Sequence, residues 1–435
     1  MAHTVKQNPD DIIVAGGGRY DQRHYEDHPD LGTDLISYEH VISPASFELE
    51  REAIFKRCWI NVGRDTRLPK VGSYFTKEIE ILKTSIIVVR GRDKKIRAFH
   101  NVCPHRGNKL VWEGDPGEEK SGKCMAFFCK YHGLGYALDG KMQVLKDPDN
   151  WFGSQGEDLH LVEVPLESWN GFLFVNFTKG GPKETLREYM GEHIWNALDD
   201  LPLNLYTQHV SGKGEINSNW KTLHDAFSEA WHGATLHSEA MVSLRNIIFR
   251  APPTRFDGPH RTAIACGTVP DDYYSFELER VSRSSVTGTR IPPAQPIEAP
   301  RAAFNEEQTD WVAVTYTVFP NFQFQVYAPG HIMTYNYWPL AYNRMRFEIN
   351  QYYQAPRNFS ELFAQKTGTA IVLDNIYQDL GTLEATQRGL ESCVYDSYPL
   401  IDEEHNIRHF HKMVDERLRA YREELASGQA HGQRK

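Results

Sequence analysis

The chain has 435 residues, of which 40% are hydrophobic and 12% aromatic, and these values predict two or three globular domains. A formal net charge of -10 and a pI near 6.0 argue against nucleic acid or an anionic membrane as the main partner. No apolar run reaches the roughly 18 residues of a transmembrane helix. The N-terminal residues lack the basic and apolar regions of a secretory signal, so we expect neither feature.

Residues 1–45 are polar and rich in Gly and Asp, which predicts an irregular N-terminal arm leading into the catalytic part of the chain. Within this arm, residues 12–21 read IIVAGGGRYD. This glycine run does not match G-x-G-x-x-G, and no βαβ pattern follows it. We therefore interpret it as a flexible arm or a subunit contact, in preference to a nucleotide site.

Residues 46–178 are predicted to form a small antiparallel β-domain. A helical pattern over 46–58 is followed by short β-branched and aromatic runs separated by Pro, Gly and Asp turns, and the last run is GFLFVNF. A Gly-Pro break and a new helical pattern at 179–190 mark the boundary.

Residues 179–435 mix helical and strand patterns and are predicted to form a second, larger domain. Residues 267–310 are rich in Pro, Ser, Thr and charge, so we expect a long loop or lid there. Residues 311–353 alternate in aromatic side chains, which predicts a strand series. Residues 371–392 and 402–426 are predicted helices, and the second has a 3.6-residue apolar stripe made of Ile407, Phe410, Val414, Leu418 and Tyr421.

Six cysteines are too few for a disulfide scaffold in a chain of this length, which fits a reducing, cytoplasmic setting where paired Cys and His indicate metal. Cys103 and His105 flank one residue, and Cys129 and His132 flank two. Such a set holds either a tetrahedral zinc or a two-iron cluster. One Cys and one His from each loop favour two inequivalent irons. Cys124 has no histidine partner, so we interpret it as a packed or free thiol.

The stretch 219–237, NWKTLHDAFSEAWHGATLH, gives Glu229, His232 and His237 a carboxylate-x2-His-x4-His spacing. On a helix Glu229 and His232 share a face, whereas His237 lies about 140° around from His232. Both histidines reach one metal only if the helix is distorted or ends between them, for which Gly233 offers a place. Two imidazoles and a carboxylate from elsewhere would form a facial triad for Fe(II). One core and one surface histidine is the alternative.

The two Cys/His pairs resemble the loops of a Rieske cluster, including the glycines Gly107 and Gly133 that follow each histidine. The resemblance implies one iron on the two cysteines and the other on the two histidines, which raises the cluster potential. The ligands would be Cys103, Cys129, His105 and His132. The spacer between the pairs is longer than usual in the family. We expect the excess, residues 113–123, to be a charged loop that leaves the ligands undisturbed.

The order of a Rieske domain, an Asn-Trp-Lys sequence and a carboxylate-x2-His-x4-His run resembles the catalytic α subunits of Rieske non-haem iron oxygenases, the aromatic-ring hydroxylating oxygenases. The resemblance covers nearly the whole chain. It implies that His232 and His237 are iron ligands. Glu229 takes the place of a carboxylate that links an iron-site histidine to a Rieske histidine of the neighbouring subunit.

The same resemblance selects the third iron ligand from YQDLGTLEATQRGL at residues 377–390. An Asp followed by a Glu five residues on and then by Gln-Arg-Gly points to Asp379, with Glu384 and Gln387 as supporting helix residues. Asp374 is the main competitor. We also expect His224 and Asp225 to be outer partners that orient an iron ligand.

The fold implied by this resemblance is α+β, with a small antiparallel β Rieske [2Fe-2S] domain and a larger catalytic domain. The larger domain would hold a curved antiparallel sheet flanked by helices, a helix-grip or START-like arrangement. The implied cofactors are the [2Fe-2S] cluster and a mononuclear Fe(II). NAD(P)H would act indirectly through a separate reductase, because the chain has no credible flavin or NAD loop.

The implied activity is that of a terminal oxygenase that uses O2 to hydroxylate or cis-dihydroxylate a hydrophobic aromatic or polycyclic substrate, as in aromatic hydrocarbon catabolism. Oxidative O- or N-demethylation uses the same metals and stays open. Candidate pocket walls are Phe227, Met241, Leu244 and the strands over 319–337. The implied partners are a ferredoxin and/or flavin reductase and a homotrimer, with or without a small β subunit.

Two other classes of protein remain as alternatives. A Rieske electron carrier without catalysis is opposed by the long sequence beyond the cluster domain and by Tyr131 in place of a second cysteine in the second loop. A zinc-stabilised binding protein is distinguished by colour and metal content.

Overall fold

A computed structural model describes residues 24–153, 158–199, 201–229, 231–237, 254–266, 311–327 and 331–428. Four sequence predictions lie outside these residues: the glycine run at 12–21, the long loop or lid at 267–310, and the pocket residues Met241 and Leu244.

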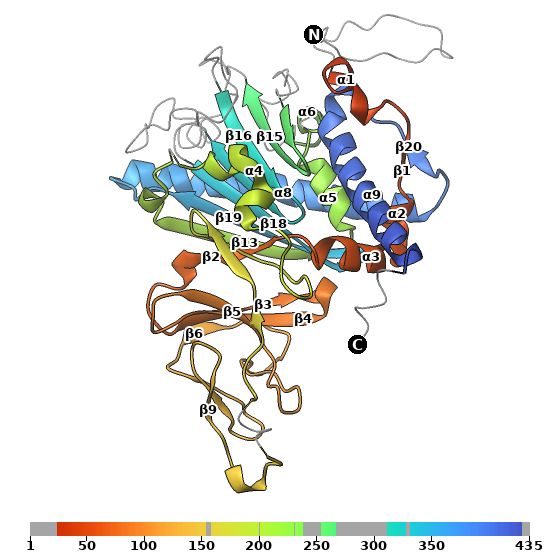
Figure 1. The fold of residues 1–435 in the computed structure, drawn as a ribbon. Helices are drawn as coiled ribbons and strands as arrows, with labels where there is room; N and C mark the ends of the chain where they lie inside the picture. Colours follow the sequence, from red (N-terminus) through yellow and green to blue (C-terminus); the bar gives the residue numbers. More distant parts are fainter. Residues whose placement is uncertain are drawn as a thin grey trace, which may run out of the picture.

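A seven-stranded antiparallel sheet organises the larger part of the molecule (Figure 1). In spatial order its strands are β13 (Gln208–Ile216), β19 (Arg344–Tyr353), β18 (His331–Ala341), β17 (Phe322–Tyr327), β16 (Trp311–Val318), β15 (His260–Cys266) and β14 (Thr254–Asp257). The predicted strand series over 311–353 is thereby confirmed. Tyr335 of β18 pairs with Gln323 on one side and Ile349 on the other, so these three side chains share one face of the sheet.

Two long helices accompany this sheet, α8 (Phe359–Glu391) and α9 (His405–Ala426). Both confirm helices predicted from the sequence, although α8 begins earlier than predicted. Asn358 caps its first turn, because the side-chain oxygen accepts the Glu361 N–H at 2.9 Å. The predicted apolar stripe of α9 faces the main core, where Phe410, Val414 and Leu418 are buried.

The prediction of an irregular arm is wrong for residues 24–42. This segment contains α1 (His24–Asp27), a 3-10 turn (Pro29–Leu31), β1 (Ile36–Ser37) and α2 (Glu39–Ile42). Long-range contacts with the C-terminal region order it. Asp402 accepts the backbone N–H groups of His24 and Tyr25 at 2.9 Å each, and β1 pairs with β20 (Ser397–Tyr398).

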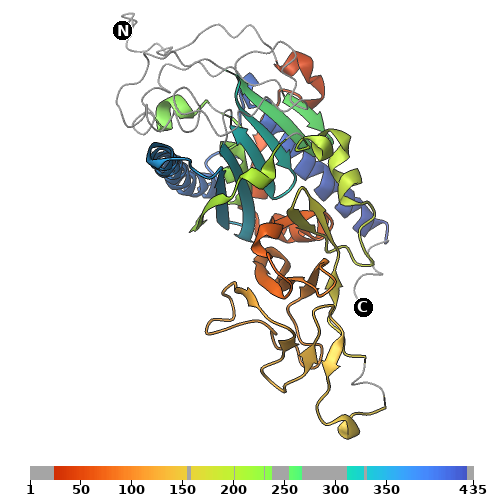
Figure 2. The same ribbon diagram turned by 90° about the vertical axis from the view of Figure 1, so that its left-hand side faces the viewer.

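A smaller lobe extends from the large sheet in both views (Figures 1 and 2). It follows α3 (Pro44–Glu50) and a π-helical turn (Arg51–Phe55), and α4 (Leu186–Asn196) comes after it. A five-stranded sheet has the order β10 (Glu163–Val164), β5 (Ile96–His100), β4 (Thr84–Arg90), β3 (Ser73–Ile79) and β6 (Ser121–Lys123). A first three-stranded sheet has the order β11 (Leu166–Trp169), β12 (Phe172–Val175) and β2 (Ile60–Arg64). A second has the order β7 (Phe127–Phe128), β8 (Gly135–Tyr136) and β9 (Met142–Val144).

Two apolar cores underlie these sheets. The small core surrounds Cys103 and Cys129. The main core includes residues from both sides of position 178, since Phe172 of β12 packs against Phe322 and Phe324 of the large sheet. The boundaries 1–45, 46–178 and 179–435 stay predictions.

The charged insert at 113–123 is more ordered than predicted. Its end forms β6, which pairs with the edge of β3. The insert also reaches the large sheet through Lys77, whose buried ammonium lies 3.1 Å from Glu119 and 2.5 Å from Glu348 of β19. Burying one ammonium between two carboxylates ties the insert, the small lobe and the large sheet together.

Candidate metal centres

The two Cys/His loops have the same backbone geometry. In the first, the Gly107 N–H donates to the Cys103 carbonyl at 3.0 Å, and in the second the Gly133 N–H donates to the Cys129 carbonyl at 2.9 Å. Both glycines have φ of 74°, in the left-handed region that glycine adopts without strain. The glycine after each histidine therefore closes the turn that places one Cys and one His on the same side.

The four side chains of these loops form a graded set. Cys103 and Cys129 are buried, with exposed fractions of 1% and 3%, whereas His132 lies at the surface. The ring centroids of His105 and His132 are 4.8 Å apart, and the buried Nδ1 of His105 has no hydrogen-bond partner. Two buried cysteine sulfurs behind two adjacent imidazoles fit an iron-sulfur cluster whose irons are bound by two cysteines and two histidines.

Nearby groups support this set on both sides. The Tyr136 hydroxyl lies 3.2 Å from the Cys103 sulfur, and the Tyr131 ring stacks on His132 with centroids 3.9 Å apart.

Cys124 is a free thiol that packs beside the small core, as predicted. Burial raises the pKa of this thiol to about 11, so it stays protonated and is a poor ligand.

The second group joins residues that are far apart in the sequence. Ligand atoms of His232, His237 and Asp379 all lie within 4.8 Å of one another, and this is the only such group of three in the described part of the chain. Asp379 Oδ1 is 3.5 Å from His232 Nε2 and 3.2 Å from His237 Nε2, yet it is buried without a hydrogen bond. Two imidazole nitrogens and one carboxylate oxygen fit a divalent iron with open positions.

A helix break brings the two histidines together. Helix α5 (Trp220–Ala226) ends before Glu229, and α6 (Gly233–Leu236) lies between His232 at its N-cap and His237 at its C-cap. The predicted break is present but begins earlier than Gly233. The prediction that Glu229 and His232 share a helix face is wrong, because Glu229 lies between the helices. Glu229 instead accepts the His232 backbone N–H at 3.1 Å.

Each histidine has a partner on the ring nitrogen that faces away from Asp379. Glu229 Oε1 hydrogen-bonds His232 Nδ1, and Gln378 Oε1 lies 3.0 Å from His237 Nδ1. Burial alone would lower the pKa of His237, but the neighbouring Asp379 and Gln378 outweigh it and raise that pKa. The sequence did not identify Gln378 as a site residue. Its position next to Asp379 indicates a role only when the face of α8 that meets His237 is known.

Each residue of the Asn-Trp-Lys sequence, which forms the N-cap and first turn of α5, has a hydrogen-bond or ion-pair partner. Asn219 caps the helix, accepting the Lys221 N–H at 2.9 Å, and its own N–H donates to Gln387 of α8 at 2.9 Å. Trp220 donates to Glu50 at 2.8 Å, and Lys221 forms an ion pair with the same carboxylate. The predicted supporting residues Glu384 and Gln387 thus hold the entry of α5, since Glu384 accepts the Asn217 N–H at 2.8 Å.

The expectation that His224 and Asp225 orient an iron ligand is wrong. Asp225 accepts from His411 at 2.9 Å, and His411 in turn lies 2.9 Å from His40. The His224 ring stacks on Phe410 with centroids 3.6 Å apart. Both side chains project from α5 toward α9, because the helix turns them away from the loop that carries Glu229 and His232.

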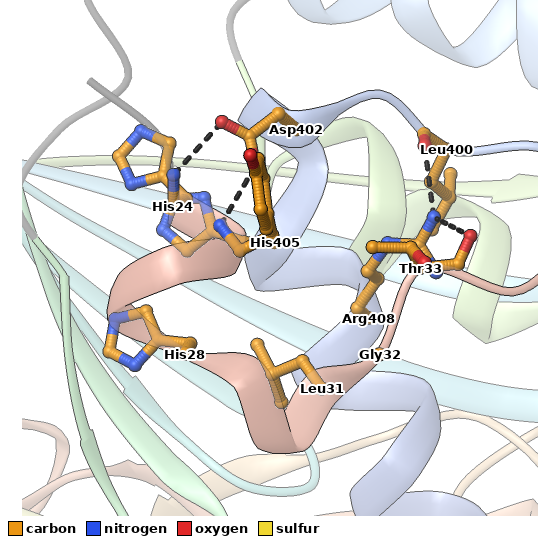
Figure 3. Close-up of a pocket in the computed structure, with 10 residues that line it drawn as sticks. His24, His28, Leu31, Gly32, Thr33, Leu400, Asp402, His405 and Arg408 are labelled. Carbon is orange, nitrogen blue, oxygen red and sulfur yellow. Dashed lines mark hydrogen bonds between the residues drawn. The ribbon is translucent and has the colours of Figure 1, made fainter.

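A small cavity lies elsewhere, between residues 24–33 and the start of α9 (Figure 3). It encloses about 100 Å³ and is lined by His24, His28 and His405, among others. Its polar groups are largely used within the protein, since Arg408 donates to the carbonyls of Asp34 and Leu400. This cavity therefore lies at the packing interface between the N-terminal segment and the start of α9.

Comparison with protein families gives two adjacent matches. The Rieske [2Fe-2S] domain matches residues 58–164, and the catalytic domain of the ring hydroxylating alpha subunit matches residues 195–420. The chain belongs to the ring hydroxylating alpha subunit family. This confirms the predicted family, its α+β fold and its two cofactors, the [2Fe-2S] cluster and the mononuclear iron.

Curated relatives of this ring hydroxylating alpha subunit include two kinds of oxygenase component. The carnitine monooxygenase oxygenase subunit of Escherichia coli (strain K12) is 32% identical over 194 residues, which are 44% of this chain and 49% of that protein. The large oxygenase component of the naphthalene 1,2-dioxygenase system of Ralstonia sp is 31% identical over 207 residues, 46% of this chain and 44% of that protein. The match thus spans about half the length of these relatives.

Solved structures share the fold over most of the chain. The quaternary ammonium Rieske monooxygenase CntA has a TM-score of 0.70 at 19% identity, covering 89% of this chain and 97% of that one. Naphthalene 1,2-dioxygenase from Rhodococcus sp. has a TM-score of 0.68 at 18% identity, covering 91% and 96%. Within the described residues, no helix is both long and apolar enough to cross a membrane.

Proposed function

We propose that this chain is the terminal component of a Rieske oxygenase, with His232, His237 and Asp379 as the ligands of a mononuclear Fe(II). The convergence of these three donors within 4.8 Å is the observation that supports this assignment most directly. Asp374 is the weaker candidate because it lies beside Gln378, 3.4 Å from its amide nitrogen. An iron bound by His232, His237 and Asp379 would supply the dioxygen activation that the reaction needs.

We propose that Cys103, His105, Cys129 and His132 hold the [2Fe-2S] cluster and that a ferredoxin or flavin reductase provides the electrons, with NAD(P)H as their indirect source. The two candidate centres lie in different lobes, near β7–β9 and near α6 (Figure 1). This separation favours electron transfer between chains of a homotrimer, with Glu229 as the link to the neighbouring chain. A quaternary ammonium Rieske monooxygenase with the same fold is a precedent for transfer between subunits, because its solved structure gave insights into inter-subunit electron transfer in that enzyme.

The proposed substrate is a hydrophobic ring compound, which the chain would hydroxylate or cis-dihydroxylate. Aromatic side chains next to the metal-binding group support this. Phe227 packs against Tyr335 and Phe347, with ring centroids 4.9 Å and 5.5 Å apart. Burial raises the pKa of Tyr335, and neighbouring groups that include Asp379 raise it further. The Tyr335 hydroxyl therefore stays neutral beside the site. These rings belong to or pack against the main core and give this side of the site an apolar wall that excludes water.

Oxidative N-demethylation is the second candidate, because the relatives include carnitine monooxygenase and a quaternary ammonium monooxygenase. A polar feature of the same sheet face also favours it. Gln323 pairs with Tyr335 across β17 and β18 and is buried, with its amide between Phe227 and Tyr337. The amide also donates to the Thr317 hydroxyl at 3.3 Å, so it is a polar group fixed within the protein that makes this face of the sheet less apolar than a surface for a hydrocarbon.

A substrate screen with a surrogate ferredoxin and reductase, read by product mass, tests both candidates. Hydroxylation adds one oxygen, and cis-dihydroxylation adds two oxygens and two hydrogens. Oxidative demethylation replaces a methyl group with hydrogen, a net loss of CH2, and releases the carbon as formaldehyde. His232→Ala should abolish every product while the cluster spectrum is retained, and His209→Ala, on the exposed strand β13, is the matched control. Unchanged turnover by His232→Ala would exclude the proposed iron site.

A further inference from the structure

The side chain of Gln378 lies between two groups of unlike chemistry. Its Oε1 is 3.0 Å from His237 Nδ1, and its Nε2 is 3.4 Å from a carboxylate oxygen of Asp374. Asp374 precedes Gln378 by four residues, so the two share a face of α8. Asp379 follows directly and is turned by about 100°, which directs its carboxylate to the other side of the His237 ring.

The carboxylate of Asp374 determines which way the amide of Gln378 points. An ionised carboxylate only accepts hydrogen bonds, so the amide must present its nitrogen to Asp374 and its oxygen to His237. The oxygen in turn accepts only from a protonated Nδ1. In a neutral imidazole this leaves the lone pair on Nε2, the atom that lies 3.2 Å from Asp379 Oδ1.

We infer that Gln378, oriented by Asp374, is a positioning residue that fixes His237 in the tautomer and ring orientation needed to bind the metal. The inference rests on the proposed function, since it takes His237 as a ligand. One helix then supplies both a ligand, Asp379, and the support of a second ligand. The two histidines are held differently, because His232 has a carboxylate partner and His237 has a neutral amide.

A neutral partner suits this position for an electrostatic reason. Asp374 and Asp379 are already within one turn of Gln378 on α8, and Asp379 is buried. A carboxylate at position 378 would add a negative charge between them. The amide provides the same acceptor atom without that charge, and it also donates to Asp374.

Equilibrium dialysis against Co(II) tests the inference with the cluster-containing full chain. Bound cobalt is measured by elemental analysis and its ligand geometry by electron paramagnetic resonance, while the cluster is measured by its visible spectrum. The variants are Gln378→Leu, Gln378→Glu, Asp374→Asn and His237→Ala. Gln365→Leu is the matched control, because Gln365 is a glutamine of the same helix that contacts the Gln354 carbonyl instead.

Gln378→Leu should weaken cobalt binding by about 10–100-fold, the usual cost of losing an outer partner of a metal-binding histidine. Gln378→Glu keeps the acceptor for His237 but adds a negative charge between Asp374 and Asp379, so its loss of affinity should be smaller than that of Gln378→Leu while binding stays weaker than in the wild type. Asp374→Asn should also give a smaller loss than Gln378→Leu, with a mixed cobalt spectrum. Gln365→Leu should match the wild type. Wild-type affinity and spectrum in Gln378→Leu would overturn the inference. Undiminished binding by His237→Ala would overturn the proposed metal site itself.

Discussion

Glu229 uses both carboxylate oxygens within its own chain. Oε1 bonds the His232 ring, and Oε2 accepts the His232 backbone N–H at 3.1 Å. The side chain is therefore fixed before any neighbouring subunit arrives. A carboxylate offers about four acceptor sites, so both of these bonds can persist while Glu229 accepts a further hydrogen bond from a neighbouring cluster histidine, as the proposed electron route requires.

Glu229→Gln should slow turnover without emptying either metal centre. The amide can keep one bond to His232, but it replaces an anionic acceptor with a neutral one and weakens a charge-assisted link. Turnover, iron content and single-turnover reoxidation of the cluster separate the effects. Loss of iron from the variant would show that Glu229 supports the ligand only, and unchanged reoxidation would remove it from the electron route.

Helix α5 is held at its start by an ion pair with no solvent access. The side chains of Lys221 and Glu50 are both 0% exposed, and Trp220 donates to the same carboxylate. Burial lowers the pKa of Lys221, although Glu50 opposes this shift. Such a pair stabilises modestly as a whole, whereas removing one partner leaves a buried charge uncompensated.

Lys221→Met should lower the free energy of unfolding by about 3–5 kcal/mol, because Glu50 then remains buried without its cation. The double variant Lys221→Met with Glu50→Gln should recover much of the loss. Denaturant unfolding followed by tryptophan fluorescence measures both. Arg187→Met, which breaks an exposed ion pair with Glu192, should leave stability nearly unchanged. Equal losses in the single and double variants would contradict the buried-charge explanation.

At the scale of the whole molecule, the proposed trimer makes the two centres of one catalytic unit belong to different chains. A chain with Cys103→Ser lacks the cluster, and a chain with His232→Ala lacks the iron site. Neither should turn over substrate alone, but mixed trimers from co-expression should recover part of the activity. Activity per iron after size-exclusion chromatography is the measurement, and complete inactivity of mixed trimers would refute transfer between chains.

Buried histidines should make the fold sensitive to acid. Burial lowers the pKa of His260, His405 and His409 to about 3, so the unfolded chain binds more protons than the folded chain between pH 3 and pH 6.5. The free energy of unfolding should fall as the pH drops below 6.5, by up to about 1.4 kcal/mol per pH unit for each histidine. His405→Phe retains a ring stacked on His24 and should show a shallower pH dependence. An identical slope would contradict this origin.

The sequence by itself determined the residue types and their local spacing. The Cys/His pairs, the glycines of their turns, the run from Glu229 to His237 and the stripe of α9 are local patterns, and local backbone geometry follows from them. The choice of Asp379 and the supporting roles of Glu384 and Gln387 came from family resemblance, and the structure places all three on the same helix as expected.

Only the tertiary structure decided what depends on contacts between distant segments. The order in residues 24–42 comes from Asp402 and β20, and the insert at 113–123 is fixed by β3 and by Lys77. The partners of Asp225 and His237 could not be predicted from spacing, since His411 and Gln378 lie more than a hundred residues away and no local pattern reports which helix faces meet. Side-chain periodicity fixes which face is buried, but packing selects the neighbour.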